Sequence, residues 1–212
     1  MSTGSRHPGL NLGEGHGSAD ERAEIAMFGF WIFLMSDFIT FGLVFAVYGT
    51  AMGATAGGPT AKDLFEFKSV CLQTAVLLFS SLTCGMVSMS LKHQHSDNQQ
   101  HSIFFLVFWI LVTTLLGMVF IGLEYRDFST MAEKGGIPSR SGWLTSYYAL
   151  VGLHGLHMIA GCLWALVLVV QALQFGLEDK VKTRLMRWSL YWHFLDIVWV
   201  GIFSGVFMGG FI

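Results

Sequence analysis

Charged side chains are scarce in this sequence. Asp, Glu, Lys and Arg make up 12% of its 212 residues, whereas hydrophobic residues make up 53%. A soluble domain of ordinary composition carries about 25% charged residues, so this composition indicates a protein that lies in lipid. The formal net charge of −2 leaves no basic excess, which argues against a nucleic-acid partner.

Cysteine is also scarce, and its spacing excludes a disulfide framework. Cys71, Cys84 and Cys162 all lie in apolar stretches, and their odd number cannot form a complete set of bridges. Cys71 and Cys84 fall on one expected helix, roughly 20 Å apart along its axis, which is too far for a bridge. We interpret all three as small buried apolar side chains.

Sequence motifs of catalysis are missing as well. The chain has no glycine-rich phosphate loop, no nucleophile elbow and no His/Glu zinc motif. The segments between its apolar stretches are too short to build an aqueous active site. The sequence therefore predicts no catalytic residue and no metal site in this chain.

Residues 1–24 lack the features of a secretory signal. They are rich in Gly, Ser, His and acidic residues, without a basic start or an apolar middle. We expect a disordered tail here, followed by one membrane domain over residues 25–212. His7 and His16 are too isolated in this tail to predict a metal site.

Long apolar segments are what the sequence does contain. A membrane helix needs about 20 apolar residues, and backbone groups in lipid must bond within their own segment. The sequence therefore predicts an all-α, polytopic bundle of five transmembrane helices. The expected spans are residues 25–48, 69–91, 103–123, 142–173 and 188–211.

The fourth span is unusually long. Residues 141–177 form a run of 37 positions without Asp, Glu, Lys or Arg. A helix of that length would extend roughly 55 Å, so we expect it to tilt, protrude or break. Breaks in the chain are expected at residues 57–60 and 135–139, with Ser139 or Ser141 capping the fourth helix. The last loop is expected at residues 176–187.

The distribution of Lys and Arg predicts the orientation. Cytoplasmic segments of membrane proteins carry an excess of these residues. The side that holds the N-terminus has seven, and the opposite side has five. We therefore expect a cytoplasmic N-terminus and, after five spans, a periplasmic C-terminus.

Asp37 lies near the middle of the first span, where a carboxyl group is costly to bury. One interpretation is a proton-handling or lipid-headgroup site. The other is a structural hydrogen bond to a neighbouring helix or to a partner subunit. The residues alone favour neither. Glu124, directly after the third span, is a further candidate for such a site.

Histidines occur in two of the spans. His154 and His157 lie three positions apart, so their imidazoles diverge by about 60° and cannot complete a haem or zinc site alone. Interhelical hydrogen bonds are the favoured interpretation. His193 and Asp196, also three apart, can pair with each other or with another helix, and we interpret them as polar contacts at a helix interface.

Glycine recurs at every fourth position near the end of the fifth span. Gly201, Gly205 and Gly209 would form a smooth strip on one helical face. Such strips allow close packing of membrane helices. The strip predicts a packing surface and identifies no chemistry.

Several strings in the spans are specific enough to indicate a family. Residues 29–37 read GFWIFLMSD, residues 154–157 read HGLH and residues 189–199 read SLYWHFLDIVW. Further matching strings lie at 56–60, 78–81, 121–124 and 149–152. In this order they resemble subunit III of haem–copper oxidases. The chain has five expected helices and begins at the helix that carries Asp37, so the cytochrome bo-type ubiquinol oxidase branch is the better match.

The resemblance implies a non-catalytic accessory subunit of a proton-pumping ubiquinol oxidase in the bacterial inner membrane. Subunit I would be the main contact, with subunits II and IV as further partners. Haems, copper and ubiquinol would lie in the partner subunits, with no cofactor in this chain. Phospholipids are expected in contact with it. Asp37 stands where cytochrome c oxidases carry a buried Glu that is linked to lipid contact and proton uptake.

Three other functions stay open at this point. The chain could be subunit III of a cytochrome c oxidase, which shares the HGLH and WHFLD strings. It could be an independent proton transporter that uses Asp37, His154 and Asp196 as a relay, although transporters commonly show repeats and broken helices. It could also be a membrane haem protein ligated by His154 and His193. Co-purification with haem–copper subunits, proton movement by the isolated chain and a haem spectrum would separate these possibilities.

Overall fold

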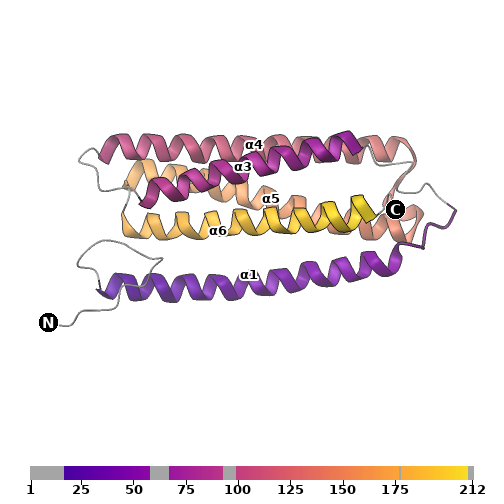
Figure 1. The fold of residues 1–212 in the computed structure, drawn as a ribbon, viewed down its shortest axis with the longest axis horizontal. Helices are drawn as coiled ribbons and strands as arrows, with labels where there is room; N and C mark the ends of the chain where they lie inside the picture. The colour runs from indigo at the N-terminus through magenta and orange to yellow at the C-terminus, as the bar shows by residue number, and fades with distance from the viewer. Residues whose placement is uncertain (1–16, 58–66, 93–98, 177, 210–212) are drawn as a thin grey trace.

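A computed structural model of the chain describes residues 17–57, 67–92, 99–176 and 178–209. Within these ranges all regular structure is helical (Figure 1). The helices are α1 (Gly17–Ala51), α3 (Phe67–Lys92), α4 (Gln99–Glu133), α5 (Gly142–Phe175) and α6 (Asp179–Ile202). A short 3₁₀ turn, η1 (Pro138–Arg140), precedes α5, and a π-helical segment, η2 (Phe203–Met208), continues α6.

The predicted number and order of membrane spans is confirmed. Five helices are long and apolar enough to cross a bilayer: Ile25–Ala51, Phe67–Ser90, Ile103–Glu133, Gly142–Phe175 and Lys180–Met208. Each helix satisfies its own backbone hydrogen bonds, as a segment in hydrocarbon must. The chain is therefore an integral membrane protein.

Three predicted boundaries differ from the structure. Residues 17–24 of the expected disordered tail are helical, whereas residues 1–16 lie outside the described residues. The third helix continues past its expected end at residue 123 to Glu133. The expected last loop at 176–187 is wrong, because α6 already begins at Asp179. Charged residues lower hydropathy without opposing helix formation, so a helix can continue beyond its most apolar stretch.

The fourth predicted span neither breaks nor shortens. α5 is one continuous helix of 34 residues, which at 1.5 Å per residue extends about 51 Å and protrudes from a typical hydrocarbon core. Of the two expected caps, Ser141 is the one used: its Oγ accepts the backbone N–H of Leu144 at 3.2 Å. Gly135, with φ +79°, supports the chain reversal before α5, as expected. Of the expected break at 57–60, only Gly57 is described.

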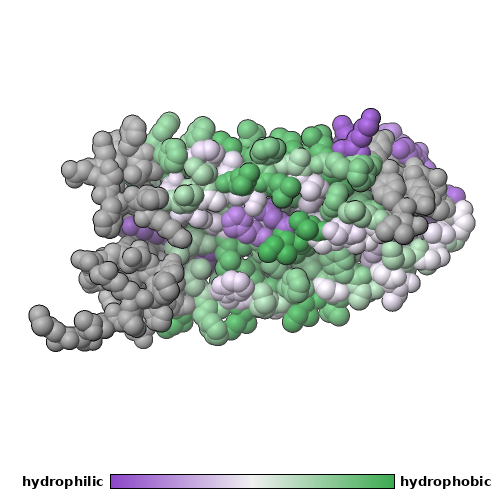
Figure 2. Space-filling model, viewed as in Figure 1, coloured by the Kyte–Doolittle hydropathy of each residue, from purple (hydrophilic) through white to green (hydrophobic). Residues whose placement is uncertain are grey.

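The helices are not equally buried. Helices α3, α4, α5 and α6 pack into a four-helix group, and α1 lies alongside it against α5 and α6 (Figure 1). In the most apolar stretch of α1, 11% of the residues are buried within the protein. The corresponding fraction in the other four helices is 33–50%. On the face drawn in Figure 2, hydrophobic side chains cover most of the middle of the molecule. Most of α1 therefore faces lipid or other chains.

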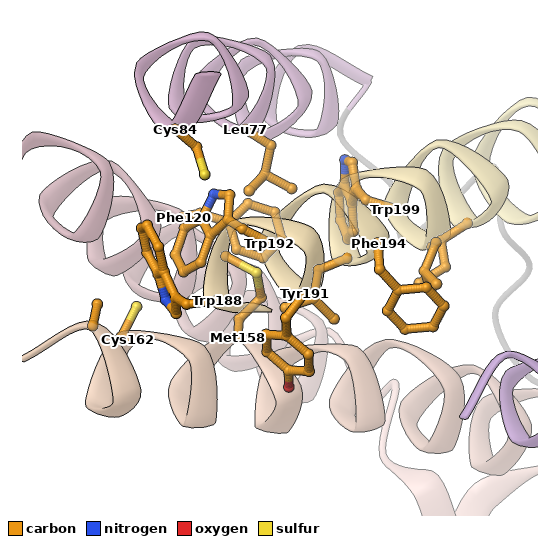
Figure 3. Close-up of a cluster of buried hydrophobic side chains, with 14 of the residues drawn as sticks. Leu77, Cys84, Phe120, Met158, Cys162, Trp188, Tyr191, Trp192, Phe194 and Trp199 are labelled. Atoms are coloured by element: carbon orange, nitrogen blue, oxygen red, sulfur yellow. The ribbon is translucent and has the colours of Figure 1, made fainter. Parts of the chain in front are cut away.

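Tryptophans of α6 hold the four-helix group together. Trp188, Trp192 and Trp199 are fully buried and project among side chains of α3, α4 and α5 (Figure 3). Each indole N–H donates a hydrogen bond: Trp188 to the carbonyl of Gly161 at 3.0 Å, Trp192 to Ser80 Oγ at 3.0 Å and Trp199 to Thr74 Oγ1 at 3.1 Å. These bonds fix the rotation of α6 against its neighbours, which positions the polar residues of that helix.

Candidate functional site

Asp37 and His157 form a contact between α1 and α5, which we call the α1–α5 pair. Asp37 Oδ2 lies 3.2 Å from His157 Nε2, and both side chains are largely buried. His157 Nδ1 lies 2.7 Å from the backbone carbonyl of Leu153. A carbonyl only accepts, so Nδ1 carries a proton and Nε2 is the ring nitrogen that faces the carboxyl group. A proton on either Nε2 or Oδ2 would join the two helices by a hydrogen bond.

His154 is more deeply buried than His157. Its side chain is fully buried, and neither ring nitrogen has a hydrogen-bond partner among the described residues. The imidazole packs against Trp199 at 5.2 Å between ring centroids, Phe120 at 5.8 Å and Phe41 at 6.5 Å. These rings come from α6, α4 and α1, so His154 lies at the meeting point of four helices.

Glu124 of α4 lies directly against the backbone of α5. The side chain is buried, and Oε2 has no hydrogen-bond partner among the described residues. A Cβ atom added to Gly155 would lie 2.6 Å from Glu124 Oε1, closer than real contacts allow. Glycine at position 155 is therefore what admits this carboxyl group. Residues Glu124, His154 and Gly155 form what we call the α4–α5 group.

His193 and Asp196 meet each other and α3. His193 Nδ1 lies 3.6 Å from Asp196 Oδ2 and 3.0 Å from Ser81 Oγ. The His193 side chain is 40% exposed, whereas that of Asp196 is 12% exposed. Ser81, His193 and Asp196 form what we call the α3–α6 patch. Sequence reasoning did not identify Ser81, because only the packing of α3 on α6 brings it to the imidazole.

Asp127 forms a fourth polar contact that the sequence did not predict. Its Oδ1 and Oδ2 accept hydrogen bonds from Ser69 Oγ at 2.9 and 2.7 Å, and Gln73 Nε2 donates to Oδ2 at 2.8 Å. Arg126 Nη2 lies 3.8 Å from Oδ1. These bonds join α3 to α4. Asp127 follows Glu124 by one helical turn, a spacing that could have indicated it.

The glycine strip at the end of the chain lies against α1. Cβ atoms added to Gly201 and Gly205 would meet the ring of Phe45 at 3.5 and 3.7 Å, and one added to Gly209 would meet Met52 at 3.9 Å. These are ordinary contact distances, so the strip packs on side chains and not closely on backbone. The close approaches occur elsewhere, at Gly117 and Gly155.

The polar residues singled out from the sequence lie on three different helix interfaces, and Asp127 adds a fourth between α3 and α4. The α1–α5 pair, the α4–α5 group and the α3–α6 patch each join a different pair of helices. His154 packs among aromatic rings while His193 contacts Ser81, so the two imidazoles proposed as haem ligands lie on different interfaces. In the part of the chain that the structure describes, no three His, Cys, Asp or Glu side chains are grouped to hold a metal ion. Polar side chains distributed in this way can join pairs of helices, and each ionisable group can bind one proton.

Comparison with known proteins places these features in a family. Residues 14–211 match the family model of cytochrome c oxidase subunit III. Over 199 residues the chain is 44% identical to cytochrome bo(3) ubiquinol oxidase subunit 3 of Pseudomonas aeruginosa, covering 94% of this chain and 92% of that protein. It is 36% identical over 186 residues to the protein of that name from Buchnera aphidicola, covering 88% and 92%.

A relative from a third genus gives the same result. The probable quinol oxidase subunit 3 of Staphylococcus aureus is 37% identical over 196 residues, with 92% of this chain and 94% of that protein covered. The matched regions include all five membrane-length helices of the structure. The chain therefore belongs to the cytochrome c oxidase subunit III family.

Proposed function

We propose that this chain is the accessory subunit III of a membrane quinol oxidase, a complex that passes electrons from ubiquinol to oxygen. One observation carries the proposal: a family match over nearly the whole chain, with relatives from three genera named as quinol oxidase subunits. Those names favour quinol over cytochrome c as the electron donor of the complex. Catalysis belongs to the complex, and this chain contributes structure.

The distribution of polar residues supports a non-catalytic role. Asp37 with His157, and His193 with Ser81, use their polar atoms on contacts between helices. Haems, copper and ubiquinol are accordingly assigned to partner subunits, with subunit I as the main contact and subunits II and IV beside it. Phospholipids would cover the remaining apolar surface. The complex would lie in the bacterial inner membrane, with the N-terminus of this chain in the cytoplasm.

We assign the α1–α5 pair a supporting role in proton handling near α1. Asp37 and His157 can exchange one proton, and both lie near the middle of their spans. The pair also attaches the least buried helix to the bundle. A change in its proton occupancy would therefore act on the packing of α1 as well as on local charge.

Purification under mild conditions tests the proposal. The affinity-tagged full-length chain would be extracted from membranes in a mild detergent, and its partners would be identified by mass spectrometry. We expect haem–copper oxidase subunits in the eluate, a reduced-minus-oxidised haem spectrum and ubiquinol oxidase activity. Detergent-stripped chain should have no haem spectrum. A chain that elutes alone, or that keeps haem after its partners are removed, contradicts the proposal.

The electron donor is tested on the same preparation. Oxygen consumption would be measured with a short-chain ubiquinol and, separately, with reduced cytochrome c. We expect oxidation of the quinol alone. Oxidation of cytochrome c at a comparable rate would assign the complex to the cytochrome c oxidases.

A further inference from the structure

The α3–α6 patch differs from the other polar clusters because it reaches the surface. His193 is 40% exposed on its side chain, whereas His157 is 19% exposed and His154 is fully buried. Figure 2 shows hydrophilic side chains interrupting the hydrophobic surface midway along the bundle. An exposed ionisable group at this depth would face hydrocarbon if lipid alone covered it, which is costly.

The depth of His193 excludes a lipid headgroup as its partner. The span of α6 covers Lys180–Met208, and His193 lies near its midpoint. At 1.5 Å per residue, about 20 Å of helix separates His193 from either end of the span. Phosphate and glycerol groups stay near the membrane surfaces, and acyl chains offer no hydrogen bond. The imidazole therefore needs a polar group that is itself carried to the middle of the membrane.

The contacts of His193 determine which kind of group fits. Asp196 Oδ2, at 3.6 Å, and Ser81 Oγ, at 3.0 Å, both face Nδ1. Ser81 Oγ can accept a hydrogen bond from Nδ1–H, and we assign the ring proton to Nδ1 on that geometry. In neutral imidazole Nε2 is then a hydrogen-bond acceptor. Among the described residues, no hydrogen bond or ion pair of His193 involves Nε2.

The surroundings of the imidazole allow a helix to approach. Ser81 and Gly85 lie one turn apart on α3, and a Cβ atom added to Gly85 would have nothing within 4 Å. Small residues on a helix face permit close approach of another membrane helix. The carboxyl group of Asp196 lies largely buried beside the imidazole, so Nε2 is the ring nitrogen left to face a neighbouring chain. A side chain that donates a hydrogen bond fits this acceptor.

We infer that the α3–α6 patch is a docking site for a transmembrane helix of a partner oxidase subunit, and that this helix donates a hydrogen bond to His193 Nε2 from a side chain at mid-membrane depth. The inference rests on the proposed function, because it requires a multi-subunit complex. Beyond the proposed function, the inference specifies which face of this chain contacts a partner subunit. It also specifies that the partner residue is a hydrogen-bond donor.

Photo-crosslinking within the intact complex tests the inference. Ile197 lies one turn after His193 and is 64% exposed, and Leu115 on α4 has the same exposure away from the patch. A diazirine amino acid would be placed at either position in the tagged full-length chain, and adducts would be identified by mass spectrometry after illumination. We expect the probe at Ile197 to attach to a transmembrane segment of one partner subunit. The probe at Leu115 should give no adduct with that segment.

Two substitutions of His193 test the hydrogen bond itself. His193→Leu removes the acceptor, and interhelical hydrogen bonds of this kind correspond to a roughly threefold to twentyfold change in association. We expect the Ile197 adduct to fall by about that factor in the Leu variant. His193→Gln keeps an acceptor oxygen and should retain most of the adduct. The haem content of each preparation shows that the complex is intact.

The inference is overturned if the probe at Ile197 captures only lipid or quinol in a complex that contains its haem–copper subunits. It is also overturned if His193→Leu leaves the adduct yield unchanged. Failure of the proposed function looks different, because the wild-type chain would then elute without haem–copper subunits.

Discussion

Ionisable side chains inside the membrane spans lie where helices meet. Asp37 contacts His157 across α1 and α5, and His193 contacts Ser81 across α6 and α3. Glu124 lies against the backbone of α5 at Gly155. An ionisable group in hydrocarbon is tolerated when a neighbouring helix offers it a partner or shields it from lipid. At this scale the polar residues act as contacts between helices.

Gly155→Ala should destabilise the protein through a single added methyl group. The new Cβ would lie 2.6 Å from Glu124 Oε1, and the carboxyl group has little room to move because it is buried. Overpacking of this kind costs about 1–3 kcal/mol. The effect would be measured by heating the purified complex and recording the temperature at which this subunit is lost from it.

Gly152→Ala is the matched control, since a Cβ atom there has nothing within 4 Å on the same helix. The double change Gly155→Ala with Glu124→Asp shortens the carboxyl side chain and should recover part of the loss. Equal stability of the Gly155→Ala and Gly152→Ala variants would show that Glu124 does not lie against α5.

Asp37→Asn should leave assembly and initial turnover close to wild type. An Asn side chain can still hydrogen-bond to His157 Nε2, and the redox chemistry lies in another subunit. Asp37→Leu removes the contact with His157 and should loosen α1, by about the 0.6–1.7 kcal/mol typical of an interhelical polar contact. Subunit content and the initial rate of quinol oxidation would be measured for both variants. Loss of assembly in the Asn variant would show that the carboxylate charge itself is structural.

The existence and order of the helices were largely predictable from the sequence. Which side chains of one helix contact which side chains of another was not. Apolar runs of membrane length must be helical in lipid, so the number and order of the helices followed from composition. The start of α6 at Asp179 was missed because hydropathy reports burial in lipid and not helicity. The contacts of Glu124 with Gly155 and of Ser81 with His193 depend on the rotation of each helix. That rotation is set by packing, which one sequence does not contain.

Substitution of two glycines distinguishes close helix packing from ordinary contact. A Cβ atom on Gly117 would lie 2.7 Å from Trp192 Cη2, whereas one on Gly205 would lie 3.7 Å from the Phe45 ring. Gly117→Ala should therefore displace a fully buried tryptophan and destabilise the bundle by about 1–3 kcal/mol. Gly205→Ala should be tolerated, and Gly205→Leu should push Phe45 and α1 outward.

Retention of the subunit during detergent purification would rank these three variants. The expected order of damage is Gly117→Ala first, Gly205→Leu second and Gly205→Ala last. Normal retention of the Leu variant would mean that the glycine strip faces lipid and not α1.

The molecule as a whole consists of a packed four-helix group and one helix held mainly at its side. α1 contacts α5 and α6 and exposes most of its apolar surface. Besides the α1–α5 pair, α1 is tied near its end, where Tyr48 Oη accepts a hydrogen bond from Trp143 Nε1 at 3.4 Å and Ala54 O accepts one from Trp143 N at 3.3 Å. In a subunit of a complex, the large exposed apolar surface of α1 is suited to contact with another chain.

Cysteine labelling would establish the orientation of the whole molecule. Ile137→Cys lies between α4 and α5, and Glu178→Cys lies between α5 and α6 at the opposite end; both positions are exposed. We expect a membrane-impermeant maleimide to label Cys at 137 in spheroplasts and Cys at 178 only after permeabilisation. Cys71, Cys84 and Cys162 lie within the spans and should give little background. The reverse pattern would place the N-terminus in the periplasm.

The geometry of the α1–α5 pair also bears on electrical sensitivity. Asp37 and His157 face each other from adjacent helices, so a proton that passes between them travels less than the 3.2 Å that separates Nε2 and Oδ2. The membrane voltage acts only on displacement along the bilayer normal, at about 2.3 kcal/mol per charge per 100 mV for a full crossing. So short a transfer senses only a small fraction of that energy. The division of one proton between Asp37 and His157 should therefore be nearly the same in respiring and de-energised cells.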